Sequence, residues 1–292
     1  MPHPLSLAGG DPGRDVDMPT IKICCWNVRR ASHRSAVWEL LNELSPDLAL
    51  LQEVSGLPKA ITDQYQVVMR QAAGSKQPQR FSTAILARGA IGAPIRLVSR
   101  WDWVNRELER FNGNLVAYEV SVLGREYRVL SAYSPAWPVN PERLRGIDVG
   151  PVKLKLNANV WVTELLWAAL LDSSQAGDPA PWVVGGDLNA SETFDYMWAG
   201  GPRGNREFLD RMQALGFWEC LRERHGKVVP TFRNPRDGRV VHQMDHLFVS
   251  GSMATRLMAC DTVEHARVFG ASLSDHLPIV ADFAEPDTVA GS

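Results

Sequence analysis

Apolar and polar positions along the chain predict short strands interleaved with amphipathic helices. Buried strands are predicted where apolar residues run together, over 21–28, 48–52, 81–88, 182–186, 240–250 and 279–283. The spacing of Val37, Leu40, Leu41 and Leu44 is that of one helix face, which predicts a helix over 36–44. Further helices are predicted over 152–171 and 206–215.

A hairpin is predicted within residues 116–133. Apolar residues alternate with polar ones over 116–122, and Gly124-Arg125 suits a tight turn into a second strand over 127–133. Antiparallel strands mixed with helices favour an α+β layered sandwich over a doubly wound parallel sheet. The pattern has no linker-like break.

The domain is therefore predicted to span residues 20–284. Residues 1–19 are rich in Gly, Pro and Asp, which predicts a disordered leader, and residues 285–292 are expected to form a disordered tail. With 45% hydrophobic and 22% charged residues, the chain has the composition of a globular protein. No run of 18 apolar residues exists, so no membrane insertion is expected.

The cysteines and the net charge bear on the cellular location and on the kind of partner. Cys24 and Cys25 lie in an apolar run, which predicts that they are small buried side chains. The sequence has no CxxC pair and no secretory signal, so a cytoplasmic location is expected. Net charge is −2, of which the leader and the tail contribute −2 each, so the body carries +2. This mild excess neither argues for nor excludes a nucleic-acid partner. The oligomeric state has no signal.

Polar side chains stand at the ends of many of the apolar runs. Each one closes or leaves a predicted strand; they are Asn27, Glu53, Tyr133, Asp187, Asn189, Asp245, Asp275 and His276. A carboxylate buried alone there would be costly, so their number predicts that the strand ends converge on one polar site.

The residue types fit metal-assisted phosphodiester hydrolysis. Glu53, Asp275 and the amide oxygen of Asn27 are hard oxygen ligands of the kind that Mg²⁺ or Mn²⁺ prefers. Asp187 can hold and deprotonate a water, which Asn189 can orient. Two further side chains, His276 and Tyr133, can donate a hydrogen bond to a phosphoryl oxygen.

The order of the motifs resembles the endonuclease/exonuclease/phosphatase superfamily. The motifs are WN at 26–27, LQE at 51–53, GDLN at 186–189, MDHLFVS at 244–250 and SDHLP at 274–278. The resemblance implies a four-layer α/β/β/α sandwich of two packed mixed β-sheets flanked by helices. It also implies roles for single residues.

Carried over to this sequence, Asn27 and Glu53 resemble metal ligands, with Asp275 contributing. Asp187 resembles the residue that activates the water, and Asn189 its neighbour that orients it. The resemblance makes His276 the phosphate-binding histidine and Asp245 the carboxylate that fixes its tautomer.

Two positions point to different branches of the superfamily. Tyr133 in AYSP is similar to the apurinic endonuclease and bacterial exonuclease branch. Arg29, two positions after Asn27, is similar to pancreatic-type DNases, whose arginine reaches the DNA. The subfamily therefore stays open.

Basic and histidine residues carry further alternatives. Arg29 and Arg30 are expected to clamp a phosphate, the alternative being a solvated face. Residues 96–112 mix arginines with tryptophans, which fits either a nucleic-acid loop or an ordinary helix face. His246 is expected to be a buried structural histidine, although with His242 it could form a second metal pair.

The function predicted is a Mg²⁺- or Mn²⁺-dependent phosphodiesterase, and specifically a nuclease that acts on DNA. The first alternative is a phosphatase or phosphodiesterase acting on a lipid headgroup or small phosphoester, which needs a pocket where a nuclease needs an open basic groove. The second alternative is a binding module of the same fold without catalysis.

Overall fold

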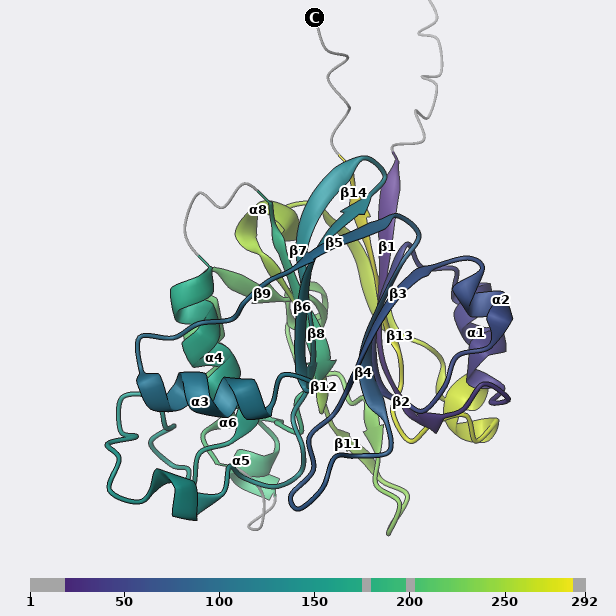
Figure 1. Cartoon of the computed structure of the whole chain (residues 1–292). Helices are drawn as coiled ribbons and strands as arrows, with labels where there is room; N and C mark the ends of the chain where they lie inside the picture. Colours follow the sequence, from purple (N-terminus) through teal and green to yellow (C-terminus); the bar gives the residue numbers. More distant parts are fainter. Residues whose placement is uncertain (1–18, 175–179, 198–202, 286–292) are drawn as a thin grey trace, which may run out of the picture.

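Two β-sheets packed face to face form the centre of the protein. The structure is a computed structural model and describes residues 19–174, 180–197 and 203–285. Helices cover the outer faces of both sheets (Figure 1), so the predicted four-layer α/β/β/α sandwich is confirmed. Thr20, the first residue of β1, pairs with Ala284, the last of β14, so both lie at one end of the sandwich.

The first sheet has the strand order β13-β14-β1-β2-β4-β3. Its strands are β1 (Thr20–Ala31), β2 (Leu48–Val54), β3 (Gln66–Gln71), β4 (Ser82–Ala87), β13 (Leu257–Thr262) and β14 (Ile279–Ala284). Strands β1 and β2 are parallel, and the other neighbours are antiparallel.

The second sheet has the order β5-β6-β7-β8-β12-β9. Its strands are β5 (Ala90–Pro94), β6 (Leu115–Val122), β7 (Arg125–Tyr133), β8 (Trp182–Asp187), β9 (Phe217–Glu219) and β12 (Asp245–Ser250). Only β7 and β8 are parallel here. A separate two-stranded hairpin joins β10 (Phe232–Arg233) to β11 (Val240–His242).

The alternation of side chains along the strands builds the layers. On β1, Ile23 and Cys25 pack into the core between the sheets, whereas Cys24 and Trp26 pack into the core under the helices of the first sheet. All four are 0% exposed, so both faces of this central strand are covered. The expectation that Cys24 and Cys25 are small buried side chains is confirmed.

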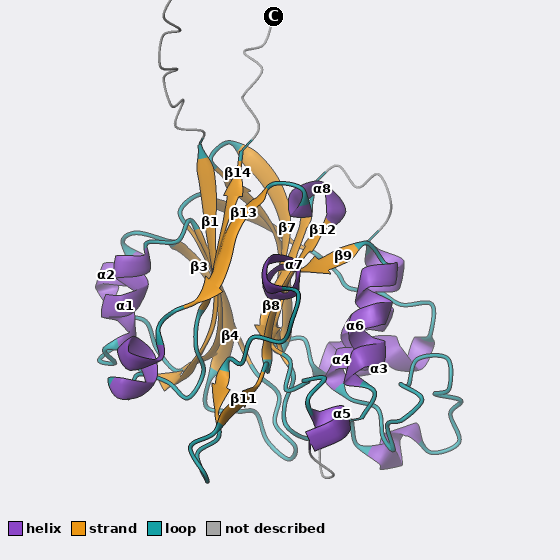
Figure 2. Ribbon diagram, turned by 180° about the vertical axis from the view of Figure 1, so that it is seen from behind, coloured by secondary structure: helices purple, strands orange, loops and turns teal. Residues whose placement is uncertain are grey.

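Helices cover the outer faces of the sheets (Figure 2). On the first sheet these are α1 (Val37–Leu44) and α2 (Lys59–Thr62); on the second, α3 (Asp102–Arg110), α4 (Val162–Ser173) and α6 (Asn205–Ala214). Shorter helices are α5 (Phe194–Met197), α7 (Cys220–His225) and α8 (Gly251–Ala254), with helical turns at Pro141–Leu144 and Ala266–Gly270. Among the described residues, no helix has the length and apolar character needed to cross a membrane.

The helix predicted over 152–171 is wrong in its first half. Residues 152–161 form turns, and α4 begins only after Trp161. The buried carboxylate of Glu164 accepts hydrogen bonds from the backbone N–H groups of Trp161, at 2.5 Å, and of Leu154, at 2.6 Å. This carboxylate caps the helix, and its hydrogen bonds fix the preceding loop against the start of the helix.

Two strand boundaries also differ from the prediction. The run 240–250 is divided: β11 belongs to the small hairpin and β12 to the second sheet. Hydrophobicity alone cannot show such a change of partner. The tight turn lies at Leu123-Gly124, one residue earlier than predicted, where both residues have positive φ, 52° and 75°, as a two-residue hairpin turn requires.

The domain end is one residue later than predicted. Glu285, assigned to the tail, is 2% exposed. Its carboxylate accepts a hydrogen bond from the hydroxyl of Tyr127 at 2.7 Å and pairs with Arg125 and Arg256. The rest of the predicted tail and residues 1–18 of the predicted leader lie outside the described residues.

Candidate active site

The directions of the strands bring the predicted polar residues together at one end of the sandwich, where the strands begin or finish; we call this end the edge. Because β1 and β2 are parallel, Asn27 and Glu53 lie at the same edge, and the parallel pair β7 and β8 does the same for Tyr133 and Asp187. Strand β12 runs the other way and starts at this edge, where Asp245 pairs with Asp187. His276 precedes β14, which is antiparallel to β1, so it reaches the same place.

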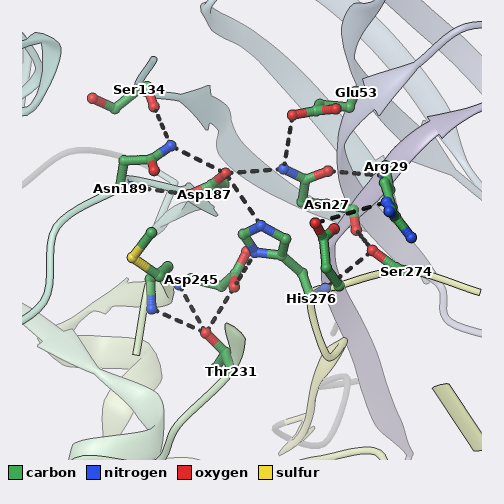
Figure 3. A network of polar contacts seen from close by, with 12 residues as sticks. Asn27, Arg29, Glu53, Ser134, Asp187, Asn189, Thr231, Asp245, Ser274 and His276 are labelled. Atoms are coloured by element: carbon green, nitrogen blue, oxygen red, sulfur yellow. Dashed lines mark hydrogen bonds and ion pairs between the residues drawn. The ribbon is translucent and has the colours of Figure 1, made fainter. Parts of the chain in front are cut away.

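Asp187 lies at the centre of the resulting network (Figure 3). Its Oδ2 accepts a hydrogen bond from Nδ2 of Asn27 at 2.9 Å and a longer one from Nδ2 of Asn189 at 3.3 Å. Its Oδ1 accepts from the backbone N–H of Asn189 at 3.0 Å. The side chain of Asn189 is also held by the carbonyl of Ser134, at 2.7 Å.

The environment of Asp187 brings its carboxyl group close to its neutral form. The residue is 2% exposed, and burial raises its pKa. The carboxylate of Asp245 adds to the rise and His276 opposes it, which leaves the pKa at about 7. A carboxylate with this pKa is matched to accepting a proton near neutral pH.

His276 is held on its other side by Asp245. Its Nδ1 lies 2.8 Å from Oδ2 of Asp245, and its Nε2 lies 3.8 Å from Oδ2 of Asp187. Asp245 is 0% exposed and accepts a further hydrogen bond from Oγ1 of Thr231 at 2.7 Å. The ring of Phe232 packs on the imidazole, with centroids 4.9 Å apart.

Two carboxylates determine the charge of His276. Burial disfavours the imidazolium, but Asp245 and Asp187 outweigh burial and raise the pKa of His276 to about 10. The ring is therefore protonated at neutral pH, with Nδ1–H donated to Asp245 and Nε2–H directed towards Asp187.

Asn27 connects the two halves of the site. Its Oδ1 accepts the backbone N–H of Arg29 at 2.9 Å, which fixes the orientation of the amide. Its Nδ2 then donates to Asp187 and, at 3.4 Å, to Oε1 of Glu53. In this arrangement Asn27 is a donor between two carboxylates, and its role as a metal ligand stays a prediction.

Glu53 and Asp275 supply the carboxylates suited to a cation. Burial raises the pKa of Glu53, and the nearby charge of Asp275 adds to the rise. Arg30 lies 3.6 Å from Glu53 and Arg29 lies 3.7 Å from Asp275, both longer than a direct hydrogen bond. The hydrogen bond from Asn27 and the charges of His276 and Arg30 oppose this rise without cancelling it. Two carboxylates whose charges still raise each other's cost fit a hard divalent ion such as Mg²⁺ or Mn²⁺.

A second group of potential ligand atoms fits a metal less well. Atoms of Asp187, Asp245 and His276 all lie within 4.8 Å of one another. A metal ligand must be deprotonated, whereas His276 is protonated and already bonded to Asp245. Among the described residues, Glu53 and Asp275 are therefore the better candidates for holding a cation, and their role as ligands stays a prediction.

Tyr133 lies beside the same carboxylates. Burial, Glu53 and Asp187 raise the pKa of its hydroxyl far above its ordinary value, so it remains a protonated donor. Its ring packs edge-on against Phe81, with centroids 5.2 Å apart. The two predictions for this residue, a catalytic donor and a core tyrosine, are compatible with this placement.

Unusual backbone conformations are concentrated around the site. Of the seven non-glycine residues with positive φ in the described ranges, four are Arg29, Arg30, Glu53 and Asn189. Such conformations are costly and persist where the surrounding structure imposes them, often at functional sites. The register of β1 and β2 also shifts between Asn27 and Ala31, so the two arginines lie on a bulge.

Three residues of the network were missed from the sequence. Thr231 orients Asp245, Phe232 packs on His276, and Ser274 accepts the backbone N–H of His276 at 3.1 Å while donating to the carbonyl of Asn27 at 2.8 Å. Ser274 belongs to the SDHLP motif and could have been found there. Thr231 and Phe232 follow a proline-containing loop and carry no comparable signal.

Two of the open alternatives are decided by packing. In the 96–112 segment, Trp103 is buried and Trp101 stacks on Trp167, so α3 is a helix with an apolar inner face and these rings serve its packing. His246 is buried and its Nε2 lies 2.9 Å from the carbonyl of Ala190, which confirms the structural histidine. Because Nε2 of His246 is held by this carbonyl and Nδ1 of His242 lies 2.6 Å from Oγ1 of Thr193, the packing favours the structural histidine over a second metal pair.

Comparison with known proteins identifies the class. Residues 24–276 match the model of the Endonuclease/Exonuclease/phosphatase family, and the chain belongs to this family. Its members hydrolyse phosphoester bonds, so the chain belongs to a class of phosphoesterases and nucleases. A comparison with curated proteins finds no match.

Several solved structures share the fold. An AP endonuclease from Archaeoglobus fulgidus is 21% identical, with a TM-score of 0.65, over 91% of this chain and 100% of that one. A 3′ phosphatase, NExo from Neisseria, bound to a product DNA hairpin, is 19% identical, with a TM-score of 0.60, over 90% and 99%. An AP endonuclease from Leishmania major is 17% identical, with a TM-score of 0.60, over 96% and 93%. At these identities the likeness concerns the fold.

Proposed function

We propose that the protein is a divalent-metal-dependent phosphodiesterase that acts on DNA. The observation that carries the proposal is the pair formed by Asp187, a carboxylate with a pKa of about 7, and His276, a cation whose Nε2 lies 3.8 Å from it. One group can take a proton from water while the other donates to a phosphoryl oxygen.

The contacts within the site give each side chain a role in the reaction. Asp187 accepts the proton of the attacking water, and Asn189, bonded to both Asp187 and Ser134, orients that water. Nε2–H of His276 donates to a non-bridging oxygen, where negative charge increases. Asp245 keeps the imidazole charged and in place.

The metal would be held by Glu53 and Asp275, with Asn27 as a further candidate. When bound, Mg²⁺ or Mn²⁺ would supply Lewis-acid stabilisation of charge on the phosphate. Tyr133 lies next to Glu53 and offers its hydroxyl as a second neutral donor at this side of the site.

The surroundings of the site support an extended polyanion as substrate. Arg29 and Arg30 are exposed at the end of β1. Arg30 also lines an open cavity of about 680 Å³ with Lys76, Arg80 and the loop around them. Two arginines beside the catalytic groups, with further cations around this cavity, suit a nucleic-acid backbone.

A small phosphoester is the second candidate, because a different cavity, of about 400 Å³, reaches Asn189. The test uses purified protein with Mg²⁺ on a DNA duplex and on bis(p-nitrophenyl) phosphate, with EDTA and the D187N variant as controls. Metal-dependent cleavage of the duplex supports the proposal. Hydrolysis of the small ester alone, without affinity for DNA, would favour the second candidate, and full activity in EDTA would exclude the metal-dependent mechanism.

A further inference from the structure

A cavity beside the catalytic groups takes no part in the proton transfers of Asp187 and His276. Its volume is about 400 Å³, within the range of sites that enclose a small molecule or part of a larger one. Asn189, which orients the water, forms part of its wall. Its wall also includes Trp161, Phe194, Phe232, His242 and Met244.

Aromatic rings on this wall favour a flat ligand. Phe232 packs on His276 and so joins the cavity to the catalytic centre. Phe194 packs on the ring of His242, with centroids 4.6 Å apart. Planar heteroaromatic groups, and nucleobases in particular, stack on such rings.

His242 is a polar group on this wall, and its ring is fixed. Its Nδ1 lies 2.6 Å from Oγ1 of Thr193, which lies 2.7 Å from Oγ of Ser191. In the described part of the chain, Nε2 of His242 has no hydrogen-bond partner. Burial and the nearby charge of Arg239 lower the pKa of His242, so the ring is neutral at pH 7. Its Nε2 can then form one hydrogen bond with a ligand, as donor or acceptor according to the tautomer.

The rim of the cavity carries positive charge. Arg236 and Arg239 are exposed there, and Arg239 is paired with Asp237, at 2.7 Å. An aromatic cavity with a cationic rim next to a phosphodiesterase centre matches a nucleotide, whose base is flat and whose phosphates are anionic.

We propose that this cavity binds the base of a nucleotide at the phosphodiester to be cleaved, and that His242 determines specificity by a hydrogen bond to the edge of that base. The inference rests on the proposed action on DNA and names the part of the substrate that the cavity recognises. Thr193 is a positioning residue, because it acts through His242.

The test compares two DNA duplexes that differ at one position, where one has a nucleobase and the other a tetrahydrofuran residue without a base. The ratio of kcat/KM between the two substrates is measured for each variant. His242→Phe keeps a ring and removes both nitrogens, so we expect it to lower the base-to-tetrahydrofuran ratio about tenfold, the scale of one hydrogen bond. A general loss of folded protein would lower both rates and leave the ratio unchanged.

Variants of Thr193 test the fixed ring. Thr193→Val removes the hydroxyl and should lower the ratio severalfold, whereas Thr193→Ser keeps it and should restore the ratio. His265→Phe makes the same chemical change as His242→Phe at an exposed position and serves as the control.

The outcomes separate the inference from the function on which it rests. If the wild-type protein cleaves neither duplex in Mg²⁺, the proposed action on DNA is wrong. If it cleaves both, and the ratio is the same in wild type and His242→Phe, the cavity does not recognise the base. A closed dumbbell duplex has no ends, so its cleavage would show that the cavity takes an internal nucleotide turned out of the helix. Cleavage of the linear duplex alone would show that it takes a terminal nucleotide. Either result supports a base in the cavity when the ratio depends on His242.

Discussion

Nδ1 of His276 lies 2.8 Å from Oδ2 of Asp245, although the chain separates the two residues by 31 positions. The carboxylate is fully buried, and its other oxygen, Oδ1, has no hydrogen-bond partner among the described residues. An anion with this little solvation is stabilised chiefly by its cationic neighbour, so the charges of the two residues depend on each other.

The pair predicts a change in the protonation of His276 when Asp245 becomes neutral. Asp245→Asn removes a main cause of the raised pKa, so the pKa of His276 should fall from about 10 towards neutral or below, because burial then dominates. NMR of the imidazole in metal-free protein measures this directly, and turnover should fall together with it. Asp261→Asn, on exposed β13, is the control, and a His276 that still carries its proton at pH 9 in D245N would contradict the assignment.

Replacement of Asp187 should separate activity from stability. Asp187→Asn removes the proton acceptor and should lower turnover by roughly 10²–10⁴-fold, the scale of acid–base groups. The free energy of unfolding should not fall, because burial already opposes the charge of this carboxylate. Denaturant unfolding and steady-state rates are measured on the same preparation; a variant that retains most of its turnover would remove Asp187 from the mechanism.

Glu53 should determine the metal requirement. Glu53→Gln keeps the shape of the side chain but removes one of the two carboxylates suited to the cation, so half-maximal activity should need a higher concentration of Mg²⁺. A Mg²⁺ titration of the rate measures the change, with Glu142→Gln, on an exposed turn, as the control. Equal titration curves for wild type and E53Q would show that Glu53 is not a ligand.

The exposed arginines at the end of β1 should contribute to the salt dependence of binding. If Arg29 and Arg30 contact phosphates, their joint replacement by Gln should flatten the slope of log K against log salt by roughly one to two units. Binding is measured in the Asp187→Asn background, so that the DNA survives. The control is a double variant, Arg88→Gln with Arg224→Gln, which should keep the slope. Arg88 lies at the opposite end of the first sheet, and Arg224 lies on α7. Equal slopes for both double variants would exclude the phosphate clamp.

Glu164 should make stability depend on pH. Burial raises its pKa from 4.5 to about 7, so the folded protein holds the proton more tightly than the unfolded chain. Unfolding therefore releases a proton between these values, and this contribution to the free energy of unfolding is full below pH 4.5 and lost as the pH rises to 7, by roughly 3 kcal/mol.

Glu164→Gln removes this dependence while it keeps one acceptor for the loop. Its stability relative to wild type should therefore rise between pH 5 and pH 7.5, as measured by urea unfolding at several pH values. The exposed Glu142→Gln should follow the wild type throughout. A constant difference between E164Q and wild type would show that Glu164 has an ordinary pKa in the folded state.

The local pattern of the sequence determined the layers and the residue types of the site. The apolar runs of β1 and β8 suffice for strands buried on both faces, and the spacing of Val37, Leu40, Leu41 and Leu44 suffices for α1. The polar residues that close these strands were recognised because a lone charge is costly at such a position. Both kinds of inference depend only on neighbours in the chain.

Tertiary structure decided everything that depends on a partner distant in the chain. No local pattern shows that β11 and β12 belong to different sheets, that Glu164 starts α4 ten residues after the predicted position, or that Glu285 is buried. The charges of Asp187 and His276 likewise arise because β8, β12 and the loop before β14 meet at one edge, where burial and opposite charges act together. Solvation and Coulomb energies depend on distances in space, and these are set only when the sheets pack.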